Sequence, residues 1–214
     1  MEKKMKNNLL PIAREGFSRI GLTLLAFIIF AILDFELLEF FSFLMLIFFI
    51  FAYRNPERIT PNFEHMSVVS PVDGVLLSIE ELKDEEYAYK LEVNSSYLNV
   101  PLLRVPLSST IESINIKHGA RLSQKSPLYK EINERVELIF QDENENKVKI
   151  SHILKQSIDN IKLNVRTKQK LVQGSRYGLM LNGITTIYLP QNFRVNVSVG
   201  QELKASQSLV GYFS

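Results

Sequence analysis

The residue types that most often carry chemistry are sparse in this chain of 214 residues. Cysteine is absent, which excludes disulfides and thiolate metal sites. The histidines, His65, His118 and His152, are scattered without ligand spacing, so we expect no metal site. The net charge of +2 is too small to indicate a nucleic-acid partner. Any chemistry must therefore come from a few short motifs.

The most informative motif runs from Ser175 to Pro190 and reads SRYGLMLNGITTIYLP. It resembles the self-cleavage segment of the short bacterial phosphatidylserine decarboxylases, which is close to RFGxIRFGSRVDVYLP. The matching residues are Arg176, Tyr177, Gly178, Gly183, Tyr188, Leu189 and Pro190, once a single-residue deletion is allowed between the two halves. Depending on where the deletion is placed, the family's Gly-Ser pair becomes Gly183-Ile184 or Asn182-Gly183.

Neither placement supplies the serine that the family converts into its cofactor. There, the serine hydroxyl attacks the preceding glycine carbonyl, and the serine becomes a pyruvoyl group that forms a Schiff base with the substrate amine. Isoleucine and glycine carry no hydroxyl. The resemblance therefore implies that Ile184 or Gly183 blocks this route, and we expect no pyruvoyl cofactor. Thr185 carries a hydroxyl, but it would have to attack the crowded Ile184 carbonyl, so a β-strand threonine is the default interpretation.

Three more blocks resemble the same family in the same order. Tyr53 to Arg58 reads YRNPER and resembles FRDPER, with Asn55 in place of aspartate. Ser70 to Gly74 resembles SPADG, and Asn133 to Arg135 is similar to a family NER triplet. Together the blocks cover about three quarters of the chain, and on this basis the chain is identified as a divergent member of the family.

A further block departs from the family pattern. The family's VFNVHVNRAPVSG supplies a histidine that is thought to act as a base, and the matching stretch here places Pro101 at that position. Proline has no proton to exchange. Of the family's Asp, His and Ser set only Asp73 remains, and without the histidine we favour a turn role in which its carboxylate bonds to nearby backbone amides.

Two arginines also stand at positions where the family has arginines near its site. Arg104 and Arg176 are implied to meet a lipid phosphate through bidentate hydrogen bonds. They are equally consistent with simple electrostatic anchors at a membrane-facing pocket. The sequence leaves both roles open.

The N-terminal residues 1–53 predict a membrane anchor made of two short apolar helices, 20–33 and 37–53. Each run is shorter than the roughly 20 residues of a comfortable spanning helix, so the pair forms either a thin helical hairpin or a shallow insertion in one leaflet. Basic residues flank the outer ends and acidic residues gather at the turn. This pattern predicts that both ends are cytoplasmic.

Residues 54–214 read as one mainly β domain. Val136 to Phe140 and Val148 to Ile153 predict a hairpin, and Val68-Val69 with Val75 to Ile79 predicts a strand, a turn and a strand. Further strands are expected at Thr185 to Leu189, Asn192 to Val199 and Ser208 to Phe213, with a turn at Gly200 to Ala205 and a solvated loop at Glu80 to Glu86. The closing phrase resembles the last strand pair of barrel-sandwich hybrid domains.

These expectations combine into a membrane-attached relative of the decarboxylases at the cytoplasmic face of a bacterial inner membrane. It would be unable to form the pyruvoyl group and would bind membrane phospholipid, a lipid-synthesis enzyme or a second copy of itself. One alternative is a working decarboxylase that makes phosphatidylethanolamine through an atypical processing site, in which case pyruvoyl would be present. The other is a structural membrane protein without lipid recognition.

Overall fold

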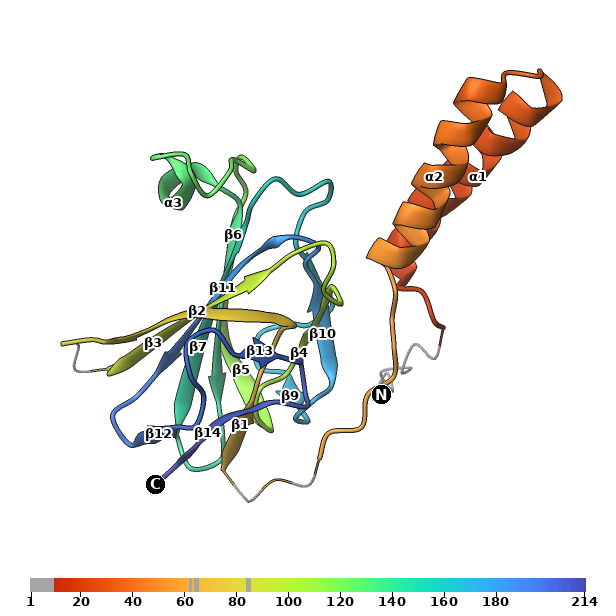
Figure 1. The fold of residues 1–214 in the computed structure, drawn as a ribbon. Helices are drawn as coiled ribbons and strands as arrows, with labels where there is room; N and C mark the ends of the chain where they lie inside the picture. The colour runs from red at the N-terminus through yellow and green to blue at the C-terminus, as the bar shows by residue number, and fades with distance from the viewer. Residues whose placement is uncertain (1–9, 62, 64–65, 84–85) are drawn as a thin grey trace. The chain divides into compact units, whose positions relative to one another are not determined.

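The computed structural model describes residues 10–61, 63, 66–83 and 86–214, so His65 lies outside the described residues. The chain divides into two compact units, Met1–Glu57 and Arg58–Ser214 (Figure 1). The first unit is helical and the second is built almost entirely from β-strands. The predicted mainly β fold is confirmed.

The first unit is a helical hairpin. A short 3-10 helix, η1 (Arg14–Gly16), leads into α1 (Phe17–Ile32), and a turn at Asp34 leads into α2 (Glu36–Ala52). Both helices begin and end slightly before the predicted limits. At the open end the Ala13 amide donates to the Tyr53 carbonyl at 2.8 Å, and the Asn55 side chain donates to the Leu10 carbonyl at 2.7 Å. These bonds hold the segment before α1 against the segment after α2.

The surface of this hairpin is apolar on nearly all sides. No residue of α1 is buried, and leucine, isoleucine and phenylalanine side chains of both helices are exposed. Within the described part of the chain, one helical stretch, Arg14–Ile32, is long and apolar enough to cross a membrane, with a mean hydropathy of 1.7. The α2 helix has a comparable composition but only 17 residues.

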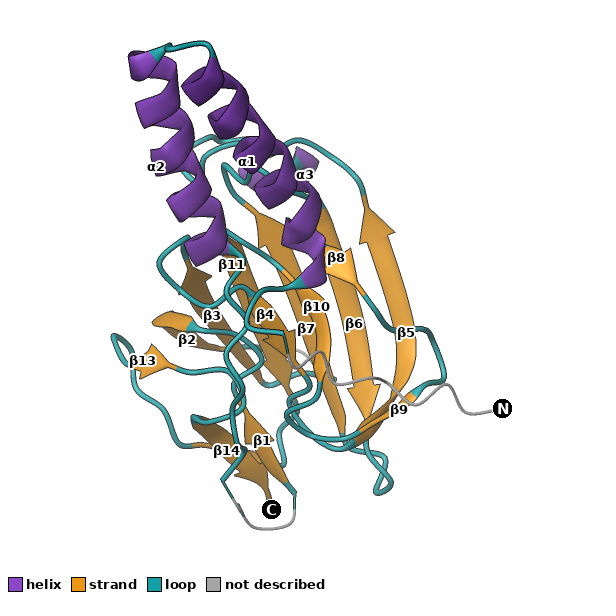
Figure 2. Ribbon diagram, turned by 90° about the vertical axis from the view of Figure 1, so that its right-hand side faces the viewer, coloured by secondary structure: helices purple, strands orange, loops and turns teal. Residues whose placement is uncertain are grey.

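The second unit contains one large antiparallel sheet and two small ones (Figure 2). The strands of the large sheet, in spatial order, are β13 (Glu202–Leu203), β2 (Gly74–Glu81), β3 (Tyr89–Ser95), β11 (Gly183–Leu189), β7 (Lys147–Leu154), β6 (Arg135–Gln141), β5 (Ser109–Lys117) and β9 (Lys170–Leu171). The small sheets are β1 (Ser67–Val69), β14 (Leu209–Phe213) and β12 (Phe193–Val195), and β4 (Leu102–Arg104), β10 (Arg176–Leu179) and β8 (Lys162–Leu163). A short helix, α3 (Tyr129–Ile132), precedes β6.

Strand β11 shows how alternation builds the core. Ile187 and Leu189 are fully buried in the main hydrophobic cluster of the domain. Ile184, which alternation places on the other face of the sheet, instead packs with Tyr129 and Ile153 in a separate small cluster. Because β11 is paired on both sides, with β3 and β7, its register is fixed by two neighbours.

Several local predictions need correction. The hairpin of β6 and β7 and the strand, turn and strand of β1 and β2 are confirmed, and β1 pairs with β14. Glu80 and Glu81 extend β2 into the predicted loop, and the predicted turn at Gly200 to Ala205 contains β13, which pairs with β2. In the stretch from Asn192 to Val199 only β12 is a strand. In each case tertiary pairing overrides the local pattern.

Candidate functional site

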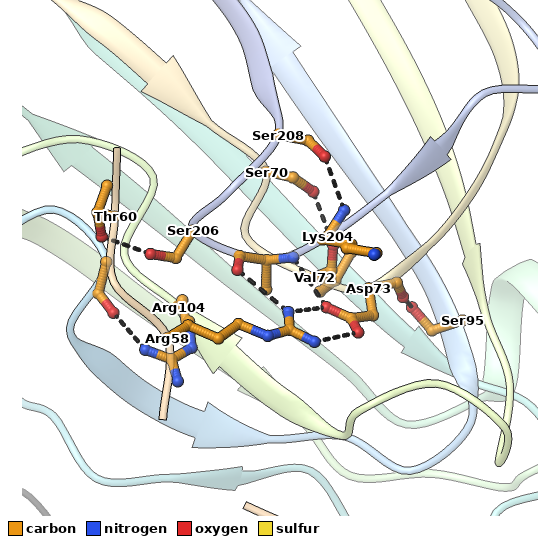
Figure 3. Close-up of polar contacts among 12 residues, drawn as sticks. Arg58, Thr60, Ser70, Val72, Asp73, Ser95, Arg104, Lys204, Ser206 and Ser208 are labelled. Atoms are coloured by element: carbon orange, nitrogen blue, oxygen red, sulfur yellow. Dashed lines mark hydrogen bonds and ion pairs between the residues drawn. The ribbon is translucent and has the colours of Figure 1, made fainter. Parts of the chain in front are cut away.

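Asp73 is the residue of the predicted catalytic set that we expect to remain, and its carboxylate forms an ion pair with an arginine. Both guanidinium Nη atoms of Arg58 donate to the Asp73 carboxylate, one to each oxygen, and the second of these bonds is 2.7 Å long (Figure 3). The Ala205 amide donates to Oδ1 at 2.8 Å. The two charged side chains are only 11% and 9% exposed. A fork-to-fork pair of this kind satisfies most of the acceptor capacity of the carboxylate.

The turn role predicted for Asp73 is therefore wrong in its detail. The Asp73 carboxylate accepts a hydrogen bond from the amide of Ala205, which is far along the chain, and not from a neighbouring amide of the turn. The turn is held instead by Ser70, whose hydroxyl donates to the Val72 carbonyl at 2.7 Å. Asp73 joins the segment before β1, which carries Arg58, to the segment after β13 (Figure 3).

Strand β3 brings the Asp73 backbone close to the predicted cleavage segment. The Ser95 hydroxyl donates to the Asp73 carbonyl at 2.5 Å (Figure 3), and Ser95 is directly opposite Gly183 in the β3–β11 ladder. Paired residues of an antiparallel ladder share one face of the sheet. Gly183 therefore lies on the face that it shares with Ser95.

Ile184 lies on the opposite face. Its ladder partners are Asn94 and Ile153, and it is 4% exposed against Tyr129 of α3. Strand alternation thus turns its side chain away from the face of Gly183 and Ser95. The predicted positions Gly183 and Ile184 are adjacent in the chain but point to different sides of the sheet.

Gly183 has no room for a side chain without adjustment. A Cβ atom built there would lie 2.6 Å from the Ile153 carbonyl oxygen and 2.6 Å from the sulfur of Met180. The close approach of β7 and the Met180 side chain therefore requires glycine at this position. The space that a nucleophilic side chain would need is filled by backbone and core atoms.

Pro101 is buried and directly precedes β4. Its carbonyl accepts the Met180 amide at 2.8 Å, which continues the pairing of β4 with β10. The residue predicted to replace the family's histidine therefore has a backbone role in a small sheet. The side chain can neither accept nor donate a proton.

Sequence reasoning missed a buried polar chain beside Ile184. The Thr185 hydroxyl lies 2.8 Å from His152 Nδ1, and His152 Nε2 lies 2.7 Å from the Tyr177 hydroxyl. All three residues are fully buried. Burial lowers the pKa of His152 to about 3 and raises the pKa of Tyr177. His152 is therefore neutral at physiological pH. Only the ladder register, which pairs Thr185 with His152, could have revealed this contact.

The two arginines for which the sequence left a phosphate contact or an anchoring role open are neighbours in the ladder of β4 and β10, where Arg104 pairs with Arg176. Arg104 is 4% exposed, and its Nη1 donates to the Gly174 carbonyl at 2.9 Å. Arg176 is half-buried. Burial and the Gly174 contact favour a structural role for Arg104.

Lys155 is another group that the sequence did not single out. It follows β7, its amide donates to the Asn182 carbonyl at 3.1 Å, and its ammonium group donates to the Asn94 side chain. Asn94 is the ladder partner of Ile184. Burial lowers the pKa of Lys155. Among the described residues, no cluster of three or more histidine, aspartate or glutamate side chains could hold a metal ion.

The fold and the site together define a mainly β protein in which a buried aspartate–arginine pair lies close to the segment that begins at Gly183. Residues 45–211 match the family model described as phosphatidylserine decarboxylase. The chain therefore belongs to the phosphatidylserine decarboxylase family.

Relatives confirm this over nearly the whole chain. The phosphatidylserine decarboxylase proenzyme of Geobacter metallireducens is 30% identical over 217 residues, which cover 97% of this chain and 99% of the relative. The proenzyme of Geotalea uraniireducens is 28% identical over 211 residues, with 97% and 99% covered. That of Desulfotalea psychrophila is 26% identical over 206 residues, with 94% and 96% covered.

Proposed function

We propose that this chain is a membrane-attached relative of the decarboxylases that cannot form the pyruvoyl group and acts by binding membrane phospholipid. The observation that carries the proposal is the environment of the residue after Gly183. Ile184 has no nucleophile and is packed against Tyr129 and Ile153 on the face of the sheet opposite Ser95. Pro101 supplies no base, and Asp73 is held by Arg58.

Membrane attachment is supported by the apolar surface of the helical hairpin. Helices of 16 and 17 residues are about 24 to 26 Å long, close to the ~30 Å hydrocarbon core of a bilayer. The turn carries Asp34 and Glu36, whose carboxylates are costly in hydrocarbon. We therefore favour a hairpin that crosses the bacterial inner membrane, with the β domain on the cytoplasmic face. A lipid-synthesis enzyme or a second copy of the chain is the protein partner that this location would allow.

The purified chain is expected to remain uncut. Intact mass spectrometry should give a single species of 24.7 kDa, because neither Gly183 nor Ile184 can attack the preceding carbonyl. The Ile184→Ser chain should also stay intact, because its new hydroxyl would lie beneath Tyr129 on the face opposite Ser95. Adding Pro101→His to it tests whether a base alone is missing.

A C-terminal piece that begins at residue 184 or 185 with a keto group in place of its amine would overturn the inactive interpretation. Cleavage of Ile184→Ser alone would show that the orientation of β11 does not block processing. An intact chain that binds vesicles without preference for phosphatidylserine or phosphatidylglycerol would leave a purely structural membrane protein.

A working decarboxylase is the second candidate, and one contact favours it. The Thr185 hydroxyl is 2.8 Å from a neutral histidine nitrogen. Attack of that hydroxyl on the Ile184 carbonyl carbon would break the amide and form an ester, and elimination would release the Ile184 carboxylate. Hydrolysis by water would then release ammonia and leave a 2-oxobutanoyl group in place of pyruvoyl. The mass of the C-terminal fragment distinguishes these two groups.

The chain should fractionate with membranes and resist extraction by high salt, because the described residues of its hairpin expose many large apolar side chains. Detergent should release it. Removing residues 1–53 should move the β domain to the soluble fraction. Recovery of the full chain from the cytosolic fraction without detergent would contradict the anchor.

A further inference from the structure

The two ends of the large sheet carry different charges. Strand β6 begins at Arg135 and ends at Gln141, and β7 returns from Lys147 to Leu154, so the sheet has two opposite ends about 23 Å apart. The turn between these strands carries Asp142, Glu143 and Glu145. The other end contains the segment 117–132, which includes α3 (Figure 2). Its charged residues are Lys117, Arg121, Lys125, Lys130 and Glu131.

Three segments meet at this basic end. The Tyr97 hydroxyl accepts from the Ile158 amide at 2.8 Å, which joins segment 96–100 to segment 155–160. The Gln156 amide donates to the Arg121 carbonyl at 3.0 Å, and Arg121 Nη1 donates to the Ser157 carbonyl at 3.1 Å. Segment 117–132 is thereby fixed beside the other two. We call this surface, made by residues 96–100, 117–132 and 155–160, the basic end.

Exposed aliphatic side chains stand among these cations. Leu98 is 76% exposed, and Leu128, Ile132 and Ile158 are between 36% and 47% exposed. Single exposed aliphatic side chains are common on protein surfaces, but four on segments that contact one another form a group. Aliphatic side chains surrounded by lysine and arginine match a bilayer surface, where acyl chains lie beneath anionic headgroups.

We propose that the basic end is a second membrane contact, through which the β domain rests on an anionic lipid surface. Gly183 begins β11 at this same end, so lipid headgroups would meet the part of the domain that holds Gly183, Asn182 and Lys155. The acidic turn at 142–146 would point away from the anionic surface, which favours one orientation of the domain. The inference rests on the proposed membrane attachment and names the lipid class that the domain recognises.

The absence of cysteine from the chain allows a direct test on the full-length protein. Single Leu98→Cys and Ile158→Cys variants are labelled with an environment-sensitive fluorophore. Val172→Cys is the matched control, since Val172 is a 71% exposed aliphatic residue that follows β9 near the acidic end. Each variant is reconstituted into phosphatidylcholine vesicles with or without phosphatidylglycerol, and spin-labelled lipid is added as the quencher.

We expect spin-labelled lipid to quench the probes at 98 and 158 at least twofold more than the probe at 172, and more strongly with phosphatidylglycerol present. The Lys125→Gln/Lys130→Gln double variant should lose the phosphatidylglycerol dependence, whereas Lys170→Gln, near the acidic end, should retain it. Equal quenching at the three positions in vesicle-bound protein would overturn the proposal and leave the hairpin anchor intact. Probe shifts that follow protein concentration instead of lipid would assign the surface to a second copy. Failure of the chain to bind vesicles would overturn both proposals.

Discussion

The Arg58→Ala chain is expected to lose about 3 to 5 kcal/mol of unfolding free energy, the usual cost of removing one partner of a buried ion pair. Arg58 and Asp73 are 11% and 9% exposed, and the guanidinium group contacts both carboxylate oxygens. Without it, the Asp73 carboxylate would remain buried, with the Ala205 amide as its remaining hydrogen-bond donor among the described residues. Such a loss is a large fraction of the stability of a typical domain.

The measurement is urea unfolding of the full chain in detergent micelles, followed by far-ultraviolet circular dichroism. Lys170→Ala is the control, because the Lys170–Glu143 pair is 82% and 90% exposed and such pairs contribute less than about 1 kcal/mol. The Arg58→Ala/Asp73→Ala chain should be less destabilised than the sum of its two single changes, because no unpaired charge remains. If Arg58→Ala lowered the unfolding free energy as little as Lys170→Ala does, the Arg58–Asp73 pair would not be a major contributor to stability.

The sequence identified Asp73 as a site residue, but it did not indicate the ion pair of Asp73 with Arg58. Arg58 and Asp73 stand in two separate motifs that match the family, and both could be recognised as motif positions. Their pairing depends on how the segment before β1 runs past the segment after β13, and local patterns do not encode that path. The mainly β fold and the hairpin of β6 and β7 were predictable because alternation and turn signals are local.

The cleavage segment shows a second limit of the sequence. Two alignments were possible, one that matched the family's serine to Ile184 and one that matched it to Gly183. A shift of one residue along a strand turns the side chain to the other face of the sheet. The ladder with β3 places Gly183 opposite Ser95, so the face next to the Asp73 backbone belongs to Gly183 and not to Ile184. Register, which forms only in the folded sheet, determines which of the two residues lies on the face of Ser95.

The contact between Thr185 and His152 could not be predicted from the sequence, because it also depends on strand register. The position of His152 in the stretch Lys147 to Leu154 does not indicate which side chain it contacts. The sequence allowed only a check for metal-ligand spacing among the histidines. The structure places His152 between Thr185 and Tyr177 in the core, where its ring nitrogens are both hydrogen-bonded. That environment has a measurable consequence for acid stability.

Acid should destabilise the protein through His152. Burial lowers the folded-state pKa of His152 to about 3 from the ordinary value of 6.5, so protonation is resisted in the folded chain and proceeds freely in the unfolded chain. The contribution of the neutral ring to stability is therefore complete above pH 6.5 and is lost as the pH falls from 6.5 towards 3. The loss is about 1.4 kcal/mol for each pH unit.

Between pH 7.5 and pH 5.0 the unfolding free energy should therefore fall by about 2 kcal/mol through this residue alone. The measurement compares the wild-type chain with His152→Gln, which keeps hydrogen-bonding capacity towards Thr185 and Tyr177 but does not titrate. His152→Gln starts from a lower stability at pH 7.5 but should lack this part of the slope. Contributions that the two chains share cancel in the difference. Parallel curves for the two chains would mean that His152 is not held neutral by the core, because only a group with different pKa values in the folded and unfolded states can change the slope.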